Sequence, residues 1–340
     1  MVKRLLEALL WEKKTVKVFC NACLKYCNIQ KGKYGYCKTR FNKNNRIYTT
    51  LVNSVAGMNV HPVEEIPLFH FMPSTNTLSL TLATKDSFEN LNKEWVALQK
   101  YLPLRTRLKE IEYENVVKKA VKEKCKSITF DYIESALAID YAYKVARTAS
   151  RYLTKTVLVT NGYITHEMIR LYAKFFDGFL ICVKASLDKN FYKKYDSIVK
   201  NIEEIKDNIA AIRKRFIHFE VANLIIPKIG DNAESCAELA EFLVDLNPDI
   251  PLHLIQFYPD EKFPELEPTP ISTLERCAEA AKRAGLRYVY ISNVPENFYI
   301  NTYCYNCNEI LIKRNYGMVL ENNLLNSRCP SCGFRINVVE

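Results

Sequence analysis

Four cysteines near the end of this 340-residue chain constrain its fold more than any other feature. They form two Cys-x2-Cys pairs separated by 21 residues, and the four positions are Cys304, Cys307, Cys329 and Cys332. Two such pairs across a hairpin place four thiolates at the corners of a tetrahedron, as in a closed structural zinc site or a rubredoxin-like iron site. So short a segment buries too little surface to fold alone, and metal binding must supply much of its stability. We therefore predict a zinc ribbon over residues 301–340.

A second group of four cysteines lies near the start of the chain, with two, three and nine residues between successive members. The group consists of Cys20, Cys23, Cys27 and Cys37. Gly32 and Gly35 fall in the last gap and permit tight turns there. The spacing predicts one four-thiolate site within residues 1–50, which we interpret as zinc; an iron-sulfur cluster is the alternative, because both accept four thiolates. The remaining cysteines are isolated and are predicted to be small buried residues: Cys125, Cys182, Cys236 and Cys277.

Positive charge is concentrated in the same N-terminal module. Residues 1–50 carry twelve Lys and Arg against Glu7 and Glu12, a local excess of ten that equals the net charge of the whole chain. Such a concentration fits a phosphate-rich partner such as RNA or the ribosome. It fits equally a solvated lysine-rich surface that keeps the protein soluble, and both interpretations stay open.

The cysteine content and the lack of long apolar runs bear on localisation. Twelve cysteines, eight of them at metal-site spacings, favour a reducing compartment over disulfide formation. No apolar run is long enough to cross a bilayer. The leucines of residues 5–10 are interrupted by Glu7 and predict an amphipathic helix rather than a leader peptide. We expect a cytoplasmic protein that has no membrane partner.

Residues 51–300 alternate short apolar runs with helical patterns, which is typical of β/α units around a parallel sheet. Seven runs are predicted as strands, over residues 78–83, 127–131, 155–160, 178–183, 218–225, 252–257 and 287–291. The clearest helix is predicted over 273–284, with Ser272 and Glu275 as a capping box and Gly285 as its stop. So many units favour a partial β/α barrel over a doubly wound sheet.

Ordered motifs along nearly the whole chain resemble the radical S-adenosylmethionine enzymes, in the branch named after the AmmeMemoRadiSam system and related to pyruvate formate-lyase activating enzyme. The matching stretches are the Cys-x2-Cys-x3-Cys opening, PVEEIPLFHFMP at 62–73, TNGY at 160–163 and GLRYVYISNVPEN at 285–297. The resemblance implies a partial (β/α)6-type barrel over residues 51–300. An N-terminal four-cysteine module precedes it and a rubredoxin-like ribbon follows it.

The resemblance breaks at the loop after the first strand. There the family carries Cys-x3-Cys-x2-Cys, which holds a catalytic 4Fe–4S cluster and leaves one iron free for S-adenosylmethionine. In this sequence the same register falls on Lys85, Glu89 and Asn92, whose side chains cannot replace three thiolates. A capping-box pattern and apolar residues at steps of three and four predict an ordinary helix over 87–101. The protein is therefore expected to lack the radical cluster.

Polar side chains at predicted strand ends define a candidate ligand pocket. They are Glu134, Thr160, Asn161, Lys184 and His253. Barrels of this kind place their active sites at strand ends, and in the resembling family the site binds a small molecule. Alternatively, Asn161 and Gly162 make a turn, Lys184 pairs with a carboxylate and His253 is structural.

The sequence leaves three functions open. The first is a pseudoenzyme without the radical cluster that binds a macromolecular partner, namely RNA, the ribosome or a protein complex, through its metal-stabilised modules. The second is an enzyme that retains a pocket for S-adenosylmethionine or another small molecule and performs non-radical chemistry. The third places a redox-active iron-sulfur cluster at the N-terminal cysteines, since radical chemistry needs a cluster to supply its electron.

Overall fold

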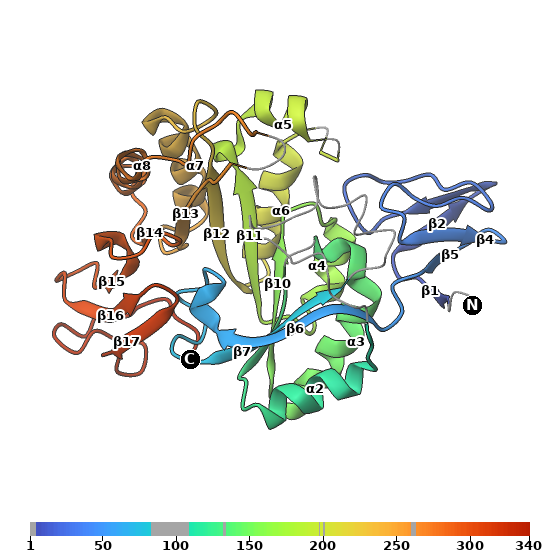
Figure 1. Ribbon diagram of the computed structural model, residues 1–340, viewed down its shortest axis with the longest axis horizontal. Coiled ribbons are helices and arrows are strands. Elements are labelled where there is room, and N and C mark those ends of the chain that lie inside the picture. Colours follow the sequence, from blue (N-terminus) through green and yellow to red (C-terminus); the bar gives the residue numbers. More distant parts are fainter. Residues whose placement is uncertain (1–4, 83–108, 132–133, 197, 200, 260–262) are drawn as a thin grey trace. The chain divides into compact units, whose positions relative to one another are not determined.

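The computed structural model describes residues 5–82, 109–131, 134–196, 198–199, 201–259 and 263–340 (Figure 1). The chain divides into two compact units, each built from separate segments. The first unit contains residues 1–60, 77–179 and 196–217, and the second contains residues 61–76, 180–195 and 218–340. None of the helices in the described ranges has the length and apolar character needed to cross a bilayer.

The first unit begins with short antiparallel strands. β1 (Leu6–Glu7), β5 (Arg46–Thr49) and β4 (Arg40–Lys43) form one sheet in this order, and β2 (Trp11–Lys14) pairs with β3 (Lys17–Cys20). Asn44 and Asn45 have φ values of 53° and 61°. The hairpin between β4 and β5 thus has the two left-handed residues that a type I′ turn requires.

The amphipathic helix predicted over residues 5–10 is wrong. β1 occupies part of this stretch, and the amide of Ala8 donates to the carbonyl of Ile47. Leu10 has a φ of 54°, a left-handed conformation that a right-handed helix excludes. Strand partners that lie far away in the sequence therefore override the local apolar pattern.

Parallel strands make up the centre of the first unit. β10 (Lys155–Thr160), β9 (Ser127–Phe130) and β7 (Asn76–Leu82) are neighbours in this order and pair in parallel, followed by β6 (Ser54–Pro62) and β8 (Lys109–Glu110). All four residues of β9 are buried, as expected for a strand covered on both faces. The helical segments are α2 (Tyr113–Lys122), η2 (Ser135–Ala138), α3 (Ile139–Ala149), η3 (Ser150–Tyr152), α4 (His166–Tyr172) and α6 (Glu203–Arg213).

The second unit repeats the β/α pattern and ends in a small antiparallel sheet. Its larger sheet has the order β14 (Val289–Ile291), β13 (Leu252–Gln256), β12 (His218–Ile225) and β11 (Gly178–Lys184), and β12, β13 and β14 pair in parallel. Its helical segments are η1 (Val63–Glu65), η4 (Ala185–Leu187), α5 (Lys189–Tyr195), α7 (Ala233–Leu246), α8 (Ile271–Arg283) and η5 (Phe298–Ile300). β15 (Thr302–Tyr303), β16 (Ile310–Asn315) and β17 (Met318–Asn322) form the terminal sheet in this order.

The strand predictions are confirmed, since each of the seven is present with its ends within two residues of those expected. The predicted capping box at Ser272 is wrong, because α8 begins at Ile271 with Pro270 as its cap residue. The predicted stop at Gly285 is confirmed by its φ of 112°. The helix predicted over 87–101 lies outside the described residues. Closure into a barrel and a division at residues 50 and 300 stay predictions.

Candidate functional site

The C-terminal ribbon brings its four cysteines together. The sulfur atoms of Cys304, Cys307, Cys329 and Cys332 all lie within 4.8 Å of one another. Those of Cys304 and Cys332 are 3.6 Å apart, and those of Cys307 and Cys329 are also 3.6 Å apart. Zn–S bonds of about 2.3 Å at tetrahedral angles require sulfur separations of about 3.8 Å. The donor set therefore fits a four-thiolate metal site, at the residues that the sequence predicts.

Each cysteine pair lies on a turn of the same shape. The amide of Asn308 donates to the carbonyl of Cys304, and the amide of Gly333 donates to the carbonyl of Cys329, both at 2.9 Å. Asn308 and Gly333 have φ values of 61° and 72°, in the left-handed region that asparagine and glycine adopt at low cost. This turn explains why one of these two residue types follows each Cys-x2-Cys.

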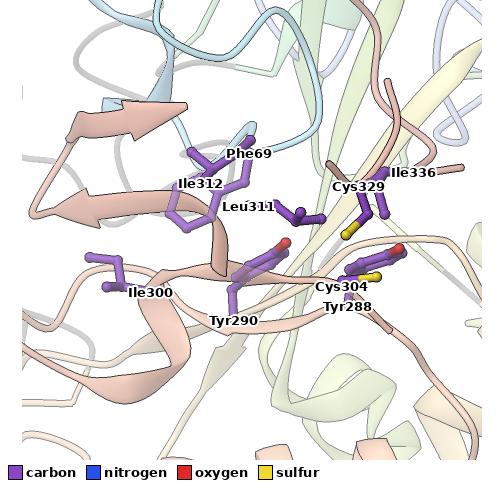
Figure 2. Packing of buried hydrophobic residues seen from close by; sticks show 9 residues of the cluster. All are labelled: Phe69, Tyr288, Tyr290, Ile300, Cys304, Leu311, Ile312, Cys329 and Ile336. Carbon is purple, nitrogen blue, oxygen red and sulfur yellow. The ribbon is translucent and has the colours of Figure 1, made fainter. Parts of the chain in front are cut away.

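One side of the metal site is part of an apolar cluster in the second unit, as Figure 2 shows. Cys304 and Cys329 are buried, whereas Cys307 and Cys332 are exposed. The other members of the cluster are Phe69, Tyr288, Tyr290, Ile300, Leu311, Ile312 and Ile336. Two metal ligands are thus fixed by the core, and the other two face solvent.

The N-terminal cysteines lie near one another in the first unit, but their sulfur atoms do not meet as closely as those of the ribbon. Cys20, Cys23 and Cys37 are buried, and Cys27 is half-buried. Burial raises the pKa of the Cys23 thiol, and the neighbouring Cys20 and Cys37 thiols raise it further. Within the described part of the chain, however, the thiol set that meets to within 4.8 Å is the C-terminal one. A metal site at the N-terminal cysteines stays a prediction.

A buried ion pair fixes the start of the chain in the first unit. Arg40 donates from Nη2 to Oδ2 of Asp140 at 2.8 Å, and both side chains are 2% exposed. Arg40 also donates to the carbonyl of Leu9, while the amide of Leu9 donates to Asp140, both at 2.5 Å. Arg40 and Asp140 are therefore paired with each other and with the backbone of Leu9. These bonds tie the N-terminal strands to α3.

Three of the five predicted pocket residues meet at the end of β10. The Glu134 carboxylate accepts from the Thr160 hydroxyl at 2.7 Å, from the Asn161 amide at 2.6 Å and from the Ala136 amide at 3.2 Å. Glu134, Thr160 and Asn161 are fully buried. These bonds hold η2 against the end of β10. A small pocket beside Glu134 is lined by Leu80, Leu82, Phe130, Asp131, Ala138 and Ala142.

The turn after β10 supports the N-terminal module. Gly162 has a φ of 80°, and the amide of Leu24 donates to the carbonyl of Tyr163 at 2.8 Å. The Thr165 hydroxyl donates to the carbonyl of Asn21 at 2.7 Å. The interpretation of Asn161 and Gly162 as a turn is therefore supported by its contacts.

The other two predicted pocket residues lie in the second unit and in different surroundings. Lys184 ends β11, and its amide donates to the hydroxyl of Tyr192 at 3.1 Å. His253 lies on β13 with its Nε2 atom 2.8 Å from Oε2 of Glu220. The predicted set is therefore divided between separate local sites.

Glu220, which the sequence analysis missed, is the centre of a buried network. Its oxygens accept from the amides of Phe69 and His70 at 2.9 Å each, and from Nε2 of His218 and His253 at 3.1 and 2.8 Å. Burial alone would raise the pKa of Glu220, but the hydrogen bonds from His218 and His253 hold it well below its usual value. A charged carboxylate thus anchors the Phe69–His70 segment to β12.

A second chain of hydrogen bonds links the ribbon to His70. Arg314 donates to the Thr302 hydroxyl at 2.8 Å, and that hydroxyl lies 2.9 Å from the hydroxyl of Tyr290, which is 2.7 Å from Nε2 of His70. Nδ1 of His70 lies 2.9 Å from the carbonyl oxygen of Asn337 and must donate to it, so Nε2 accepts from Tyr290. Burial lowers the pKa of His70 to about 4, which keeps the ring neutral.

Lys85, Glu89 and Asn92, which take the places of the family's cluster cysteines, lie outside the described residues. The loss of the radical cluster therefore stays a prediction from the sequence.

One known protein matches the chain over almost its whole length. The uncharacterized protein MJ0808 of Methanocaldococcus jannaschii is 33% identical over 337 residues, which cover 98% of this chain and 99% of that protein. The chain belongs to the MJ0808 family. No protein-family model matches the sequence.

Solved structures similar to this MJ0808-family chain include radical SAM enzymes. A radical SAM methyltransferase from Sphaerobacter thermophilus has 15% identity and a TM-score of 0.45, covering 74% of this chain and 72% of that one. A structure of TYW1 with a lysine-pyruvate adduct bound has 10% identity and a TM-score of 0.43, covering 84% and 89%. A domain of pyruvate-formate lyase-activating enzyme from Bacteroides vulgatus has 15% identity and a TM-score of 0.38, covering 48% and 96%. At these TM-scores the likenesses carry no argument about activity.

The His70 geometry predicts that this MJ0808-family protein loses stability in mild acid. In the unfolded chain His70 binds a proton below pH 6.5, whereas in the folded chain it does so only near pH 4. The stability that depends on a neutral His70 is therefore fully present above pH 6.5 and is lost as the pH falls toward 4. One pKa unit corresponds to about 1.4 kcal/mol, so His70 alone should lower the free energy of unfolding by about 2 kcal/mol between pH 7 and pH 5.

Urea unfolding at the two pH values measures this effect. His70→Gln should reduce the pH dependence by the share that His70 contributes, with the rest left to groups such as the buried His253, while His166→Gln at an exposed position is the control. Equal stability of the unmodified protein at pH 7 and pH 5 would contradict the assignment of a neutral His70.

Proposed function

We propose that this member of the MJ0808 family is a metal-stabilised RNA-binding protein that has lost the radical chemistry of the enzymes it resembles. The supporting observation is a surface of the N-terminal module on which tyrosine rings and lysines are exposed together. We name this surface the tyrosine face and define it by Tyr26, Tyr34 and Tyr36 with the lysines around them.

The rings of the tyrosine face are partly exposed, and that of Tyr34 also packs against Phe41. Tyr26, Tyr34 and Tyr36 are 45%, 40% and 41% exposed, although all three flank buried cysteines or lie between them in the sequence. The Lys25 ammonium lies 4.4 Å from the centroid of the Tyr36 ring. Exposed aromatic rings beside cations are what single-stranded RNA-binding surfaces use to stack bases and hold phosphates.

The charge around these rings favours a polyanion. Exposed lysines of the module include Lys31, Lys33, Lys38 and Lys43. The two acidic residues of the module are paired elsewhere, since Glu12 lies 2.8 Å from Lys14 and Glu7 lies 3.2 Å from Arg46. Residues 1–50 therefore carry a net positive charge, which attracts phosphates over several ångströms, while Glu167 and Glu204 place negative charge near Tyr26.

The pseudoenzyme part of the proposal rests on coordination chemistry. An amine at Lys85, a carboxylate at Glu89 and an amide at Asn92 do not hold the three irons of a radical cluster. The alternative of an enzyme with a retained small-molecule pocket has less support, because the carboxylates of Asp131 and Glu134 beside the small pocket accept hydrogen bonds from Ser79 and Thr160.

Fluorescence anisotropy with labelled oligouridylate, across a salt series, tests RNA binding. Tyr34→Ala and Tyr36→Ala should each weaken binding by about 1–3 kcal/mol, because each removes a stacking partner. Lys31→Glu combined with Lys33→Glu should weaken binding and flatten its salt dependence. Tyr152→Ala is the matched control, since this tyrosine is 50% exposed in the same unit but lies on η3.

Two results would contradict the proposal. One is binding that is absent or insensitive to salt, and the other is an equal loss in the Tyr152→Ala control. Unchanged anisotropy of the oligonucleotide at every protein concentration would exclude binding of single-stranded RNA and leave a protein complex as the candidate partner.

A further inference from the structure

Ser292, His253 and Glu220 form a hydroxyl–imidazole–carboxylate line in the second unit. The Ser292 Oγ atom lies 2.7 Å from Nδ1 of His253, and Nε2 of the same ring lies 2.8 Å from Oε2 of Glu220. Ser292 directly follows Ile291, the last residue of β14, and is partly exposed, whereas His253 and Glu220 are fully buried. The hydroxyl of a partly exposed residue is thus connected through one imidazole to one buried carboxylate.

The positions of the protons follow from the charges. Glu220 accepts two amide hydrogen bonds and carries a negative charge, so Nε2 of His253 donates to it. Burial lowers the pKa of His253 against the opposing effect of Glu220, so the ring is neutral at pH 7 and Nδ1 has a free lone pair. The Ser292 hydroxyl therefore donates to Nδ1, which is the orientation that a general base needs.

The backbone on both sides of Ser292 is held in place. The amide of Ser292 lies 3.3 Å from the carbonyl of Leu254. Asn293 accepts from the amide of Gln256 at 2.7 Å and donates to the carbonyl of the same residue at 2.9 Å. The hydroxyl is therefore presented from a fixed segment, and no loop movement is needed to align it with His253.

A similar pair in the same unit shows what distinguishes Ser292. Tyr290 donates its hydroxyl to Nε2 of His70, but Tyr290 is fully buried and its hydroxyl also contacts Thr302. A buried phenol inside a closed chain of hydrogen bonds cannot meet a substrate. Of the two hydroxyl–imidazole pairs, the Ser292–His253 pair is the one whose hydroxyl belongs to a partly exposed residue.

We propose that Ser292 is an activated nucleophile that cleaves carboxylic esters, with His253 as general base and Glu220 as a positioning residue. This activity is independent of RNA binding at the tyrosine face and needs no metal. It would make the protein an enzyme of the non-radical kind, with a site built from residues of the second unit.

The reaction balances without a redox partner. Ser292 Oγ forms a bond to the ester carbonyl carbon while its proton passes to Nδ1 of His253. Collapse of the adduct breaks the bond to the leaving alcohol, which takes that proton and leaves an acyl group on Ser292. Water then adds to the acyl carbon through the same base, and release of the carboxylic acid returns the proton to Ser292.

An alkyl fluorophosphonate probe tests the proposal on the intact protein, because an activated serine displaces its fluoride. Peptide mass spectrometry should find the adduct on Ser292, and Ser292→Ala should lose it together with the hydrolysis of p-nitrophenyl acetate. Ser235→Ala, at a partly exposed serine on α7, is the matched control and should keep both signals. Ser292→Cys retains a nucleophile of similar size, so its reaction with iodoacetamide reports activation even if Ser292→Ala folds poorly.

The pH profile separates activation from a structural role. Labelling should rise with pH through an inflection below 6.5, as His253 loses its proton. The groups that face His253 are Glu220 and His218 from β12, Tyr290 from β14 and Arg314 from β16. Labelling of Ser292 that is no faster than that of Ser235 would overturn the proposal.

Discussion

Replacing Cys307 with serine should remove one metal ion per chain and unfold residues 301–340. Four thiolates meet within 4.8 Å in the ribbon, and two of the four cysteines, Cys304 and Cys329, belong to the apolar cluster that packs it. Metal binding supplies about 10–16 kcal/mol in zinc-finger peptides, which far exceeds the stability that apolar burial gives a segment this short. Hydrogen exchange of the ribbon amides together with metal analysis measures the effect.

The control for this variant is Cys125→Ala, which removes an isolated buried cysteine and should leave the metal content unchanged. Chelation of the unmodified protein should reproduce the Cys307→Ser result, because the exposed Cys307 and Cys332 give the chelator access. A ribbon whose amides stay protected after complete metal removal would refute a metal-dependent fold.

The same metal analysis bears on the pseudoenzyme proposal. Protein purified and reconstituted without oxygen should contain two zinc ions and no iron. A visible absorption band of an iron-sulfur cluster would instead favour the alternative at the N-terminal cysteines, or a radical cluster held in a way that the sequence does not predict.

Replacing Arg40 with methionine should lower the free energy of unfolding by about 3–5 kcal/mol, because it leaves the Asp140 carboxylate buried without its partner. Both side chains are 2% exposed, so water cannot replace the lost interaction. The double variant Arg40→Met, Asp140→Leu removes both charges and should recover much of the loss. Urea unfolding of the three proteins measures the difference.

Equal destabilisation by the single and double variants would show that packing, and not the unpaired charge, controls stability at this position. The exposed pair of Arg283 and Glu279 on α8 gives a comparison, since Arg283→Met removes a cation whose side chain is 72% exposed. Surface pairs of this kind contribute little, so that variant should unfold at nearly the same urea concentration as the unmodified protein.

The β/α pattern and the ribbon could be predicted because their signals are local. Each buried strand is a short apolar run, and the four ribbon cysteines lie in two pairs whose spacing allows few geometries. The N-terminal strands could not be predicted in this way. Residues 5–10 have an apolar pattern that fits a helix, and their partner Ile47 is too distant in the sequence to be identified from it.

The buried charges were missed for the same reason, although the sequence held one usable signal. Glu220 interrupts the apolar run of β12, and a lone carboxylate in a buried strand must find donors. Apart from the nearby His218, those donors come from Phe69, His70 and His253, at least 33 positions away in the chain. Arg40 and Asp140 are likewise 100 positions apart, so neither could be assigned a partner.

The contacts of the Phe69–His70 segment impose an order on biosynthesis. The amide of Val339 donates to the carbonyl of His70, and Arg314 donates to the carbonyl of Phe69 from 245 positions further along. These peptide groups have no such partners until residues 314–339 have left the ribosome. A nascent chain that stalls before the ribbon will therefore expose this segment to chaperones and proteases, which makes synthesis of the ribbon a checkpoint for the second unit.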